Sequence, residues 1–205
     1  MNANFADGRV DPPSPDVRGP YPKGVARRQE ILERAIEVFA ANGSEGTSLR
    51  AIAREIGVSH AALTHYFPSR DALLVEVYRE AERRVQKTEG PEANVVEIMA
   101  ESARRNHGVP GLVQLYSTLV AAGLESGHPD ATAFATDRFA DTRRTLAERV
   151  RRNQADGLIR PDVDPEAVAA LVIAASDGLQ QQWLLDGAAP QEQALALLKE
   201  LLAVR

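Results

Sequence analysis

The segment that most restricts the fold of this chain is residues 47–70, TSLRAIAREIGVSHAALTHYFPSR. Ser48 and Ser59 each precede a short helical run, and serine favours the start of a helix because its hydroxyl accepts a backbone N–H. Gly57 lies between the runs and supplies the positive φ that a tight turn needs, while Pro68 stops the second run. The segment therefore predicts two short helices on a tight turn, over about 47–57 and 59–66.

The rest of the chain also shows helical spacing of apolar residues, without an alternating strand pattern or an internal repeat. We therefore predict an all-α protein of about nine helices. The other helices are expected at about 23–42, 71–88, 93–107, 110–127, 130–156, 164–186 and 190–205. Residues 1–22 contain five prolines among Asp, Gly and Asn, which predicts a disordered tail.

Several chemistries are not expected from this composition. The chain has no cysteine, which excludes disulfides, cysteine-based zinc sites and a cysteine nucleophile. The four histidines do not show a metal-ligand spacing, and there is no glycine-rich phosphate loop or nucleophile elbow. We expect no enzyme activity, no metal and no cofactor. No apolar run approaches the ~18 residues of a membrane span and no secretory signal begins the chain, which predicts a cytoplasmic protein without a membrane partner.

The charge is divided unevenly along the chain. The net charge is −5; residues 1–88 carry 13 Lys and Arg against 12 Asp and Glu, and residues 89–205 carry 11 against 17. The acidic second part would be repelled by phosphate. Binding to nucleic acid would therefore depend on local placement of arginines in the first part.

The predicted helix over 59–66 has an unusual outward face. Its side chains are short or form hydrogen bonds, so that they could approach the edges of DNA bases, and a second helix on a tight turn is the usual probe of the major groove. The alternative is a helical hairpin of a protein-binding adaptor, in which Tyr66 and Phe67 are core aromatics. An adaptor needs a large exposed apolar face, and this face is polar.

Residues 27–75 resemble the DNA-binding domain of the TetR family of transcriptional regulators. The similar parts are RRQEILERAIEVFAANG, GTSLRAIAREIGVS and the stretch from Leu63 through YFPSR to Leu74. The resemblance implies that the following residues contact phosphates or bases: Thr47, Ser48, Arg50, Ser59, His60, Ala61, Ala62, Thr64, His65, Tyr66 and Arg70. Two positions depart from the family pattern, Ala61 where glycine is common and Thr64 where tyrosine is common, which puts the operator sequence in doubt.

The resemblance also implies the organisation of the whole chain. Residues 23–70 would form a helix-turn-helix DNA-binding domain, and residues 71–205 a helical ligand-binding and dimerisation domain, joined by the helix over 71–88. DGLQQQWLLD and QALALLKELL are similar to the subgroup of the betaine-regulon repressor, which does not imply betaine as a ligand. The implied function is that of a homodimeric repressor released from operator DNA by a small-molecule effector.

Two further sets of residues are predicted in the second part. The last two helices are rich in Ala and Leu, which favours a four-helix dimer interface. Its expected residues are Val168, Leu171, Val172, Ala175, Leu179, Leu195, Leu198 and Leu202. An effector cavity would be largely apolar with a few polar groups. Its expected residues are Met99, Tyr116, Leu119, Val120, Phe134, Phe139, Asp177, Gln181 and Trp183.

Overall fold

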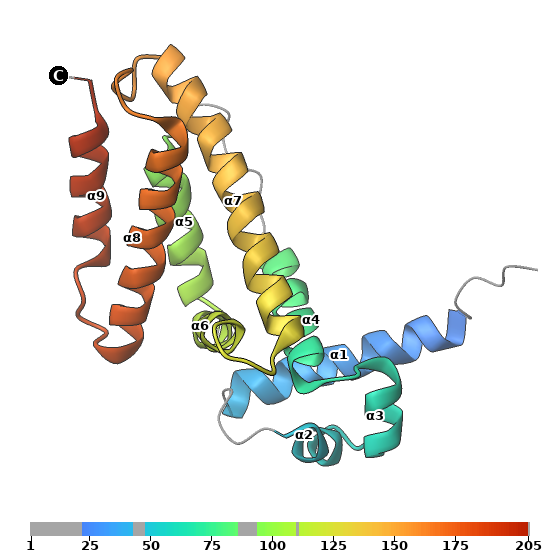
Figure 1. Ribbon diagram of the computed structural model, residues 1–205. Coiled ribbons are helices and arrows are strands. Elements are labelled where there is room, and N and C mark those ends of the chain that lie inside the picture. The colour runs from blue at the N-terminus through green and yellow to red at the C-terminus, as the bar shows by residue number, and fades with distance from the viewer. Residues whose placement is uncertain (1–21, 43–47, 86–93, 110, 205) are drawn as a thin grey trace, which may run out of the picture.

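The computed structural model describes residues 22–42, 48–85, 94–109 and 111–204, which form nine α-helices and no strand (Figure 1). The prediction of an all-α protein of about nine helices is confirmed. The helices are α1 (Pro22–Asn42), α2 (Leu49–Glu55), α3 (His60–Tyr66), α4 (Arg70–Val85), α5 (Val95–His107), α6 (Leu112–Gly123), α7 (Pro129–Ala155), α8 (Pro165–Leu185) and α9 (Gln191–Leu202).

The helices form two groups that meet at α4. In Figure 1, α1, α2 and α3 make up the lower end of the molecule, and α5 to α9 rise above it as a bundle. Helix α4 runs from the first group into the second. Helices α2 and α3 have seven residues each, and a helix of this length has little stability of its own. They are stabilised instead by packing into the core that they share with α1 and α4.

The lower core is continuous across the two groups. We use this name for the buried cluster that contains Leu32, Ile52, Leu63, Phe67, Leu74 and Tyr78 of the first four helices together with Leu115, Leu119 and Phe134 of α6 and α7. Helix α4 lies at its centre. The boundary predicted at residue 70 therefore falls inside one apolar cluster, and the division of the chain into domains there stays a prediction.

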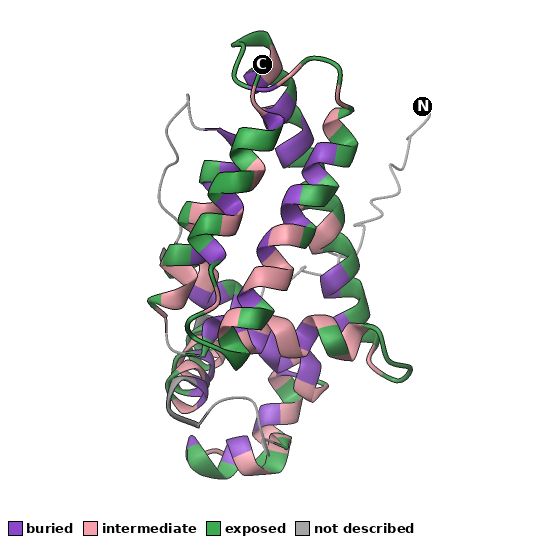
Figure 2. Ribbon diagram, turned by 90° about the vertical axis from the view of Figure 1, so that its left-hand side faces the viewer, coloured by how far each residue is buried: buried purple, intermediate pink, exposed green. Residues whose placement is uncertain are grey.

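A second cluster, the upper core, holds the bundle together. It is made of buried aliphatic side chains of α5, α7, α8 and α9, among them Val95, Leu146, Val172 and Leu195. Aromatic residues are only 5% of the chain, so that the packing depends on Leu, Val, Ile and Ala. Figure 2 shows that the buried residues face the interior of the bundle, whereas exposed ones cover its outer side.

Helix α6 differs most from the prediction, because it runs from Leu112 to Gly123 rather than over about 110–127. Gly111 precedes it with a φ of 74°, a left-handed conformation that glycine favours. At its other end, a Cβ added to Gly123 would lie 2.9 Å from the carbonyl oxygen of Ala131. Helices α6 and α7 therefore come close together at Gly123, where a larger residue would collide with the backbone.

The predicted disordered tail lies mostly outside the described residues. Pro22, its last residue, already belongs to α1, and residues 1–21 are not described. Within the parts that the structure describes, no helix is both long and apolar enough to cross a membrane.

Asn153 of α7 provides a test of how the bundle is held together. Its side chain is buried, and its Oδ1 accepts a hydrogen bond of 2.9 Å from the backbone N–H of Val95, the first residue of α5. We expect Asn153→Ala to lower the free energy of unfolding by about 1–3 kcal/mol, because a buried donor loses its acceptor. Urea denaturation measures this, and Arg152→Ala, at an exposed neighbour, should change stability by less than about 0.5 kcal/mol.

Candidate nucleic-acid interface

Helices α2 and α3 form a tight pair with a cap at each start. Ser48 Oγ accepts the backbone N–H of Ala51 at 3.2 Å, and Ser59 Oγ accepts that of Ala62 at 3.1 Å. Between the helices, Gly57 has a φ of 72°, as the sequence predicted. Caps and turn together fix where each helix begins and how the chain reverses between them.

The inner face of the pair is fully apolar. Leu63 and Phe67 are buried beneath α3, and Ile52, Ala53 and Ile56 are buried beneath α2. Because Leu63 and Phe67 are four residues apart, they define one side of α3. The opposite side of α3 must therefore face outward.

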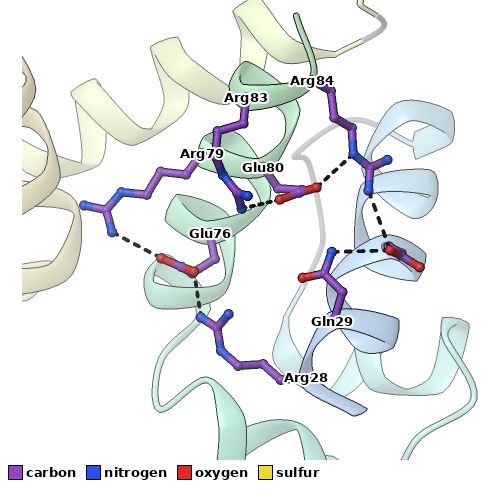
Figure 3. Close-up of polar contacts among 8 residues, drawn as sticks. Arg28, Gln29, Glu76, Arg79, Glu80, Arg83 and Arg84 are labelled. Atoms are coloured by element: carbon purple, nitrogen blue, oxygen red, sulfur yellow. Dashed lines mark hydrogen bonds and ion pairs between the residues drawn. The ribbon is translucent and has the colours of Figure 1, made fainter. Parts of the chain in front are cut away.

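Two arginines of α1 fasten this pair to the rest of the molecule. Arg34 Nη1 donates to the carbonyl oxygen of Ile56 at 2.9 Å, where α2 ends. Arg28 lies over the ring of Phe67, 4.9 Å from its centre, and donates to Glu76 of α4 at 2.6 Å (Figure 3). Although burial opposes the charge of Glu76, the hydrogen bonds from Arg28 and Arg79 outweigh it and hold its pKa below the usual value. A charged network thus sets the angle between α1, α3 and α4.

None of the predicted DNA-contacting residues that the structure describes is fully buried. Ser48, Arg50, Ser59, His60, Ala61 and His65 are exposed, and Ala62, Thr64, Tyr66 and Arg70 are half-buried. Thr47 lies outside the described residues. Whether these side chains contact DNA stays a prediction.

The two hydroxyls of α3 are already engaged by the helix. Ser59 Oγ caps it, and Thr64 Oγ1 lies 3.0 Å from the carbonyl oxygen of His60 and can donate to it. The imidazole of His65 packs edge-on against Tyr66, with their ring centres 5.0 Å apart. The outward side of α3 therefore presents two imidazoles and small side chains, which can approach a groove closely.

Arg54 was not among the predicted DNA-contacting residues. It lies four residues after Arg50 and is exposed on α2. Residues four apart share one side of a helix, so that this spacing could have identified it. Together the two arginines place positive charge beside α3, in a chain whose net charge is −5.

Three neighbouring cavities lie among the described residues of the bundle. The groove along α7 has a volume of about 470 Å³ and is lined by Met99, Arg138 and Arg149 among others. The internal cavity has a volume of about 30 Å³, room for about one water molecule, and is lined by Tyr116, Arg138 and Asp177 among others. The third, of about 140 Å³, includes Trp183 in its wall.

Asp177 and Arg138 form the polar centre of the internal cavity. Tyr116 Oη donates to Asp177 Oδ2 at 2.8 Å, and burial raises the pKa of this carboxyl group. The Arg138 guanidinium lies 5.1 Å from the ring centres of both Tyr78 and Tyr116, and it pairs with Glu82 at 2.9 Å. Asp177 and Tyr116 were among the predicted effector residues, but Arg138 was not, because its partners lie on other helices.

Four of the nine predicted effector residues line one of these three cavities: Met99, Tyr116, Asp177 and Trp183. Leu119 and Phe134 instead belong to the lower core, and Phe139 packs against the upper core. Val120 is half-buried and Gln181 is exposed on α8. These five side chains do not line the cavities described above, because helical spacing alone does not separate core from cavity wall.

Comparison with known proteins supplies the remaining observation. Residues 31–77 match the family described as "Bacterial regulatory proteins, tetR family", and residues 117–204 match "BetI-type transcriptional repressor, C-terminal". The chain belongs to the TetR family. It is therefore a helix-turn-helix transcriptional regulator, and the first match contains both α2 and α3.

Individual relatives agree with this assignment. The chain is similar to the HTH-type transcriptional repressor Rv1474c of Mycobacterium tuberculosis, 27% identical over 173 residues, which cover 84% of this chain and 89% of the relative. It resembles the structure of Salmonella enterica GusR at 26% identity, with a TM-score of 0.65 and coverage of 86% and 93%. The multidrug binding protein EbrR, solved with imidazole, is 27% identical, with a TM-score of 0.60 and coverage of 88% and 92%.

In this TetR-family chain, half of the predicted dimer residues are part of the subunit's own core. Val168, Val172, Leu195 and Leu202 are buried in the upper core, while Ala175, Leu179 and Leu198 pack against it. Only Leu171 of the predicted set is largely exposed. The outward face of α8 and α9 is formed instead by Ala167, Ala170, Leu171, Ala174, Gln181, Gln182, Leu185, Leu197, Leu201 and Val204.

The corner between α6 and α7 is fastened to the start of α4. His128 Nδ1 lies 2.6 Å from Oδ2 of the buried Asp71, and Ser69 Oγ donates to Asp130 Oδ2 at 2.5 Å. Ser69 Oγ also accepts the backbone N–H of Ala72 and so caps α4. We call these two side-chain contacts the α4 latch. The sequence analysis missed it, since the paired residues are about sixty positions apart.

Gly57 tests how the turn positions α3. We expect Gly57→Ala to lower the free energy of unfolding by about 1–2 kcal/mol, because a Cβ is disfavoured at a φ of 72°. The cost comes from the backbone alone, since an added Cβ would meet only Arg34 Nη1, at 3.9 Å. Urea denaturation measures it, with Gly187→Ala as the control in an ordinary turn. Equal stability of the two variants would contradict a required left-handed turn.

Proposed function

We propose that this regulator is a cytoplasmic homodimeric repressor that reads operator DNA with α3 and releases it when a small molecule enters the bundle. The outward polar side of α3, held rigidly by apolar anchors, is the observation that carries the proposal. A protein-binding adaptor is disfavoured, because the exposed part of this helix offers imidazoles rather than an apolar surface.

For DNA, we propose that α3 enters the major groove while α2 contacts the backbone. His60, Ala61 and His65 would meet base edges or adjacent phosphates, and Arg50 and Arg54 would pair with phosphates. Because phosphate contacts do not distinguish sequences, the imidazoles and small side chains of α3 would supply the specificity.

For dimerisation, we propose the outward face of α8 and α9. Leu171, Leu197 and Leu201 are each more than half exposed, at 51%, 55% and 56%. Alanines at 167, 170 and 174 follow the same side of α8 and would let a second copy approach closely. Pairing of two copies would set two α3 helices about 34 Å apart, or a multiple of this distance, so that each reads a half-site.

For release, we propose that the effector binds in the cavities around Arg138 and Asp177. The groove along α7, which Arg138 lines, has room for a small molecule. The internal cavity is too small, so that an effector that reaches Asp177 would separate Tyr116, Arg138 and their neighbours. Because the α4 latch joins the α6–α7 corner to α4, such a movement of α6 and α7 would also displace α4. It would thereby change the distance between the two α3 helices of the dimer. Effector and operator would then weaken each other reciprocally, typically by about 1–3 kcal/mol.

One experiment tests the proposal as a whole. Duplexes bound by the purified chain are selected from genomic fragments, and the mass of the free protein is measured by light scattering. We expect a defined duplex whose affinity falls steeply with salt, and a particle of twice the chain's mass. Failure to retain any duplex, or a monomer that binds a single half-site, would contradict it.

His65 tests the reading surface. We expect His65→Ala to weaken binding to the selected duplex by about 1–3 kcal/mol with unchanged thermal stability, because this exposed imidazole would lose a contact to base or phosphate. Gel-shift titration measures the affinity. Thr145→Ala on α7, also exposed but remote from α3, should bind as the unmodified protein does; equal affinities for both variants would sink the assignment.

The α4 latch is tested without knowledge of the effector. We expect His128→Ala to lower the free energy of local unfolding of the first turns of α4 by about 1–2 kcal/mol, since the buried Asp71 loses the imidazole that lies 2.6 Å from its Oδ2. Hydrogen exchange in the first turns of α4 should accelerate about tenfold, measured by mass spectrometry. His60→Ala is the control, because its side chain is exposed on α3. Unchanged exchange in α4 would show that the latch does not restrain it.

A further inference from the structure

The third cavity lies at the end of the bundle nearest α6, between the carboxyl ends of α5 and α8. Its volume is about 140 Å³. Its wall consists of Asn106, His107, Val109, Gly111, Val113, Gln114, Trp183 and Leu184. None of the described residues that line it is charged.

An aromatic stack forms one side of this cavity. The imidazole of His107 lies parallel to the indole of Trp183, with ring centres 3.7 Å apart and an angle of 9° between the planes. Burial lowers the pKa of His107, which favours the neutral ring. The stack is therefore a flat and uncharged surface.

One hydrogen-bonding group of this stack is unsatisfied. His107 Nε2 is buried and has no hydrogen-bond partner in the structure. Buried polar atoms without a partner are rare in folded proteins, and they often mark a position where another molecule binds. When Nε2 is the unprotonated nitrogen of the neutral imidazole it accepts a hydrogen bond, and a hydroxyl or N–H group of a ligand could then satisfy it by donating.

Size and polarity restrict what the cavity could hold. A cavity of about 150 Å³ is known to hold one benzene molecule, so that this one suits a single six-membered ring. The side-chain amides of Asn106 and Gln114 add neutral hydrogen-bonding groups, and Val109, Val113 and Leu184 add apolar surface. An ionised group would be buried here without a partner of opposite charge, which is strongly unfavourable.

The cavity adjoins the proposed effector region. Asn106 and Val113 line both this cavity and the internal cavity that contains Asp177. A ring held beside His107 would thus lie next to the residues that must separate on effector binding.

We propose that the His107–Trp183 cavity is a subsite for a neutral, single-ring aromatic group that carries a hydroxyl or N–H. It would bind this part of the effector, so that the inference rests on the proposed ligand-responsive function. The ring packs against the apolar wall and the stacked pair. Its polar hydrogen-bonding group meets His107 Nε2 once the imidazole rotates to expose this nitrogen to the cavity, because Nε2 is buried in this structure.

The protein carries its own probe for this subsite, because Trp183 is its only tryptophan. Three ligands of similar size are titrated against the full chain while its tryptophan fluorescence is followed: phenol, anisole and benzoate. We expect a saturable change with phenol, at least about tenfold weaker binding of anisole, which lacks a donor, and no saturable change with benzoate. Equal binding of phenol and anisole, or stronger binding of benzoate, would overturn the proposal.

Two variants locate the interaction at His107. His107→Phe retains an aromatic ring beside Trp183 but has no nitrogen, and phenol should then bind no better than anisole. His107→Gln retains a hydrogen-bonding group and should keep part of the preference for phenol. An undiminished preference in His107→Phe would place the hydrogen bond elsewhere and contradict the assignment; if that variant does not fold, the wild-type titrations and His107→Gln decide.

Operator binding separates this proposal from the proposed function. A chain that binds its operator but shows no preference for phenol contradicts the subsite alone. A chain that binds phenol with the expected preference and retains no duplex contradicts the proposed function alone.

Discussion

The packing of α4 into one core with its neighbours on both sides is the constraint on which the rest of the structure depends. Tyr78 of α4 is 2% exposed, and its ring centre lies 5.6 Å from that of Tyr116 and 5.4 Å from that of Phe134. On its other side α4 contributes Leu74 to the cluster that buries Leu63 and Phe67. Close-packed cores transmit displacement rather than absorb it, so that α4 cannot move without moving α3.

Three carboxylates along α4 pair with side chains of specific neighbouring elements. Asp71 faces His128, Glu76 faces Arg28 and Glu82 faces Arg138, so that successive turns are paired with the residue that precedes α7, with α1 and with α7 itself. Charged hydrogen bonds of this kind are stronger and more directional than apolar contacts. The start of α4 is thereby tied to the α6–α7 corner, and its middle to the helix that supports α3. Helix α4 thus connects the surroundings of Arg138 with the α2–α3 pair.

Local signals in the sequence accounted for most of the helices and for the polar, outward side of α3. Ser48, Ser59 and Gly57 act through their nearest neighbours, and the structure shows the caps and the left-handed turn that they predicted. The structure places Leu63 and Phe67 in the core, which defines the inner side of α3. The predicted end of α6 near Gly127 was wrong, since the helix ends at Gly123.

What the sequence determined by itself is therefore the all-α architecture, the start and turn of the α2–α3 pair, and the side of α3 that faces solvent, since each depends on residues within a few positions. Only the tertiary structure decided which face of α8 packs inward, because both faces of an Ala- and Leu-rich helix are apolar. It alone brought His128 to Asp71, Arg138 to Glu82 and Trp183 to His107, pairs that lie more than fifty positions apart. Such pairs depend on how whole helices cross, and no local pattern specifies that.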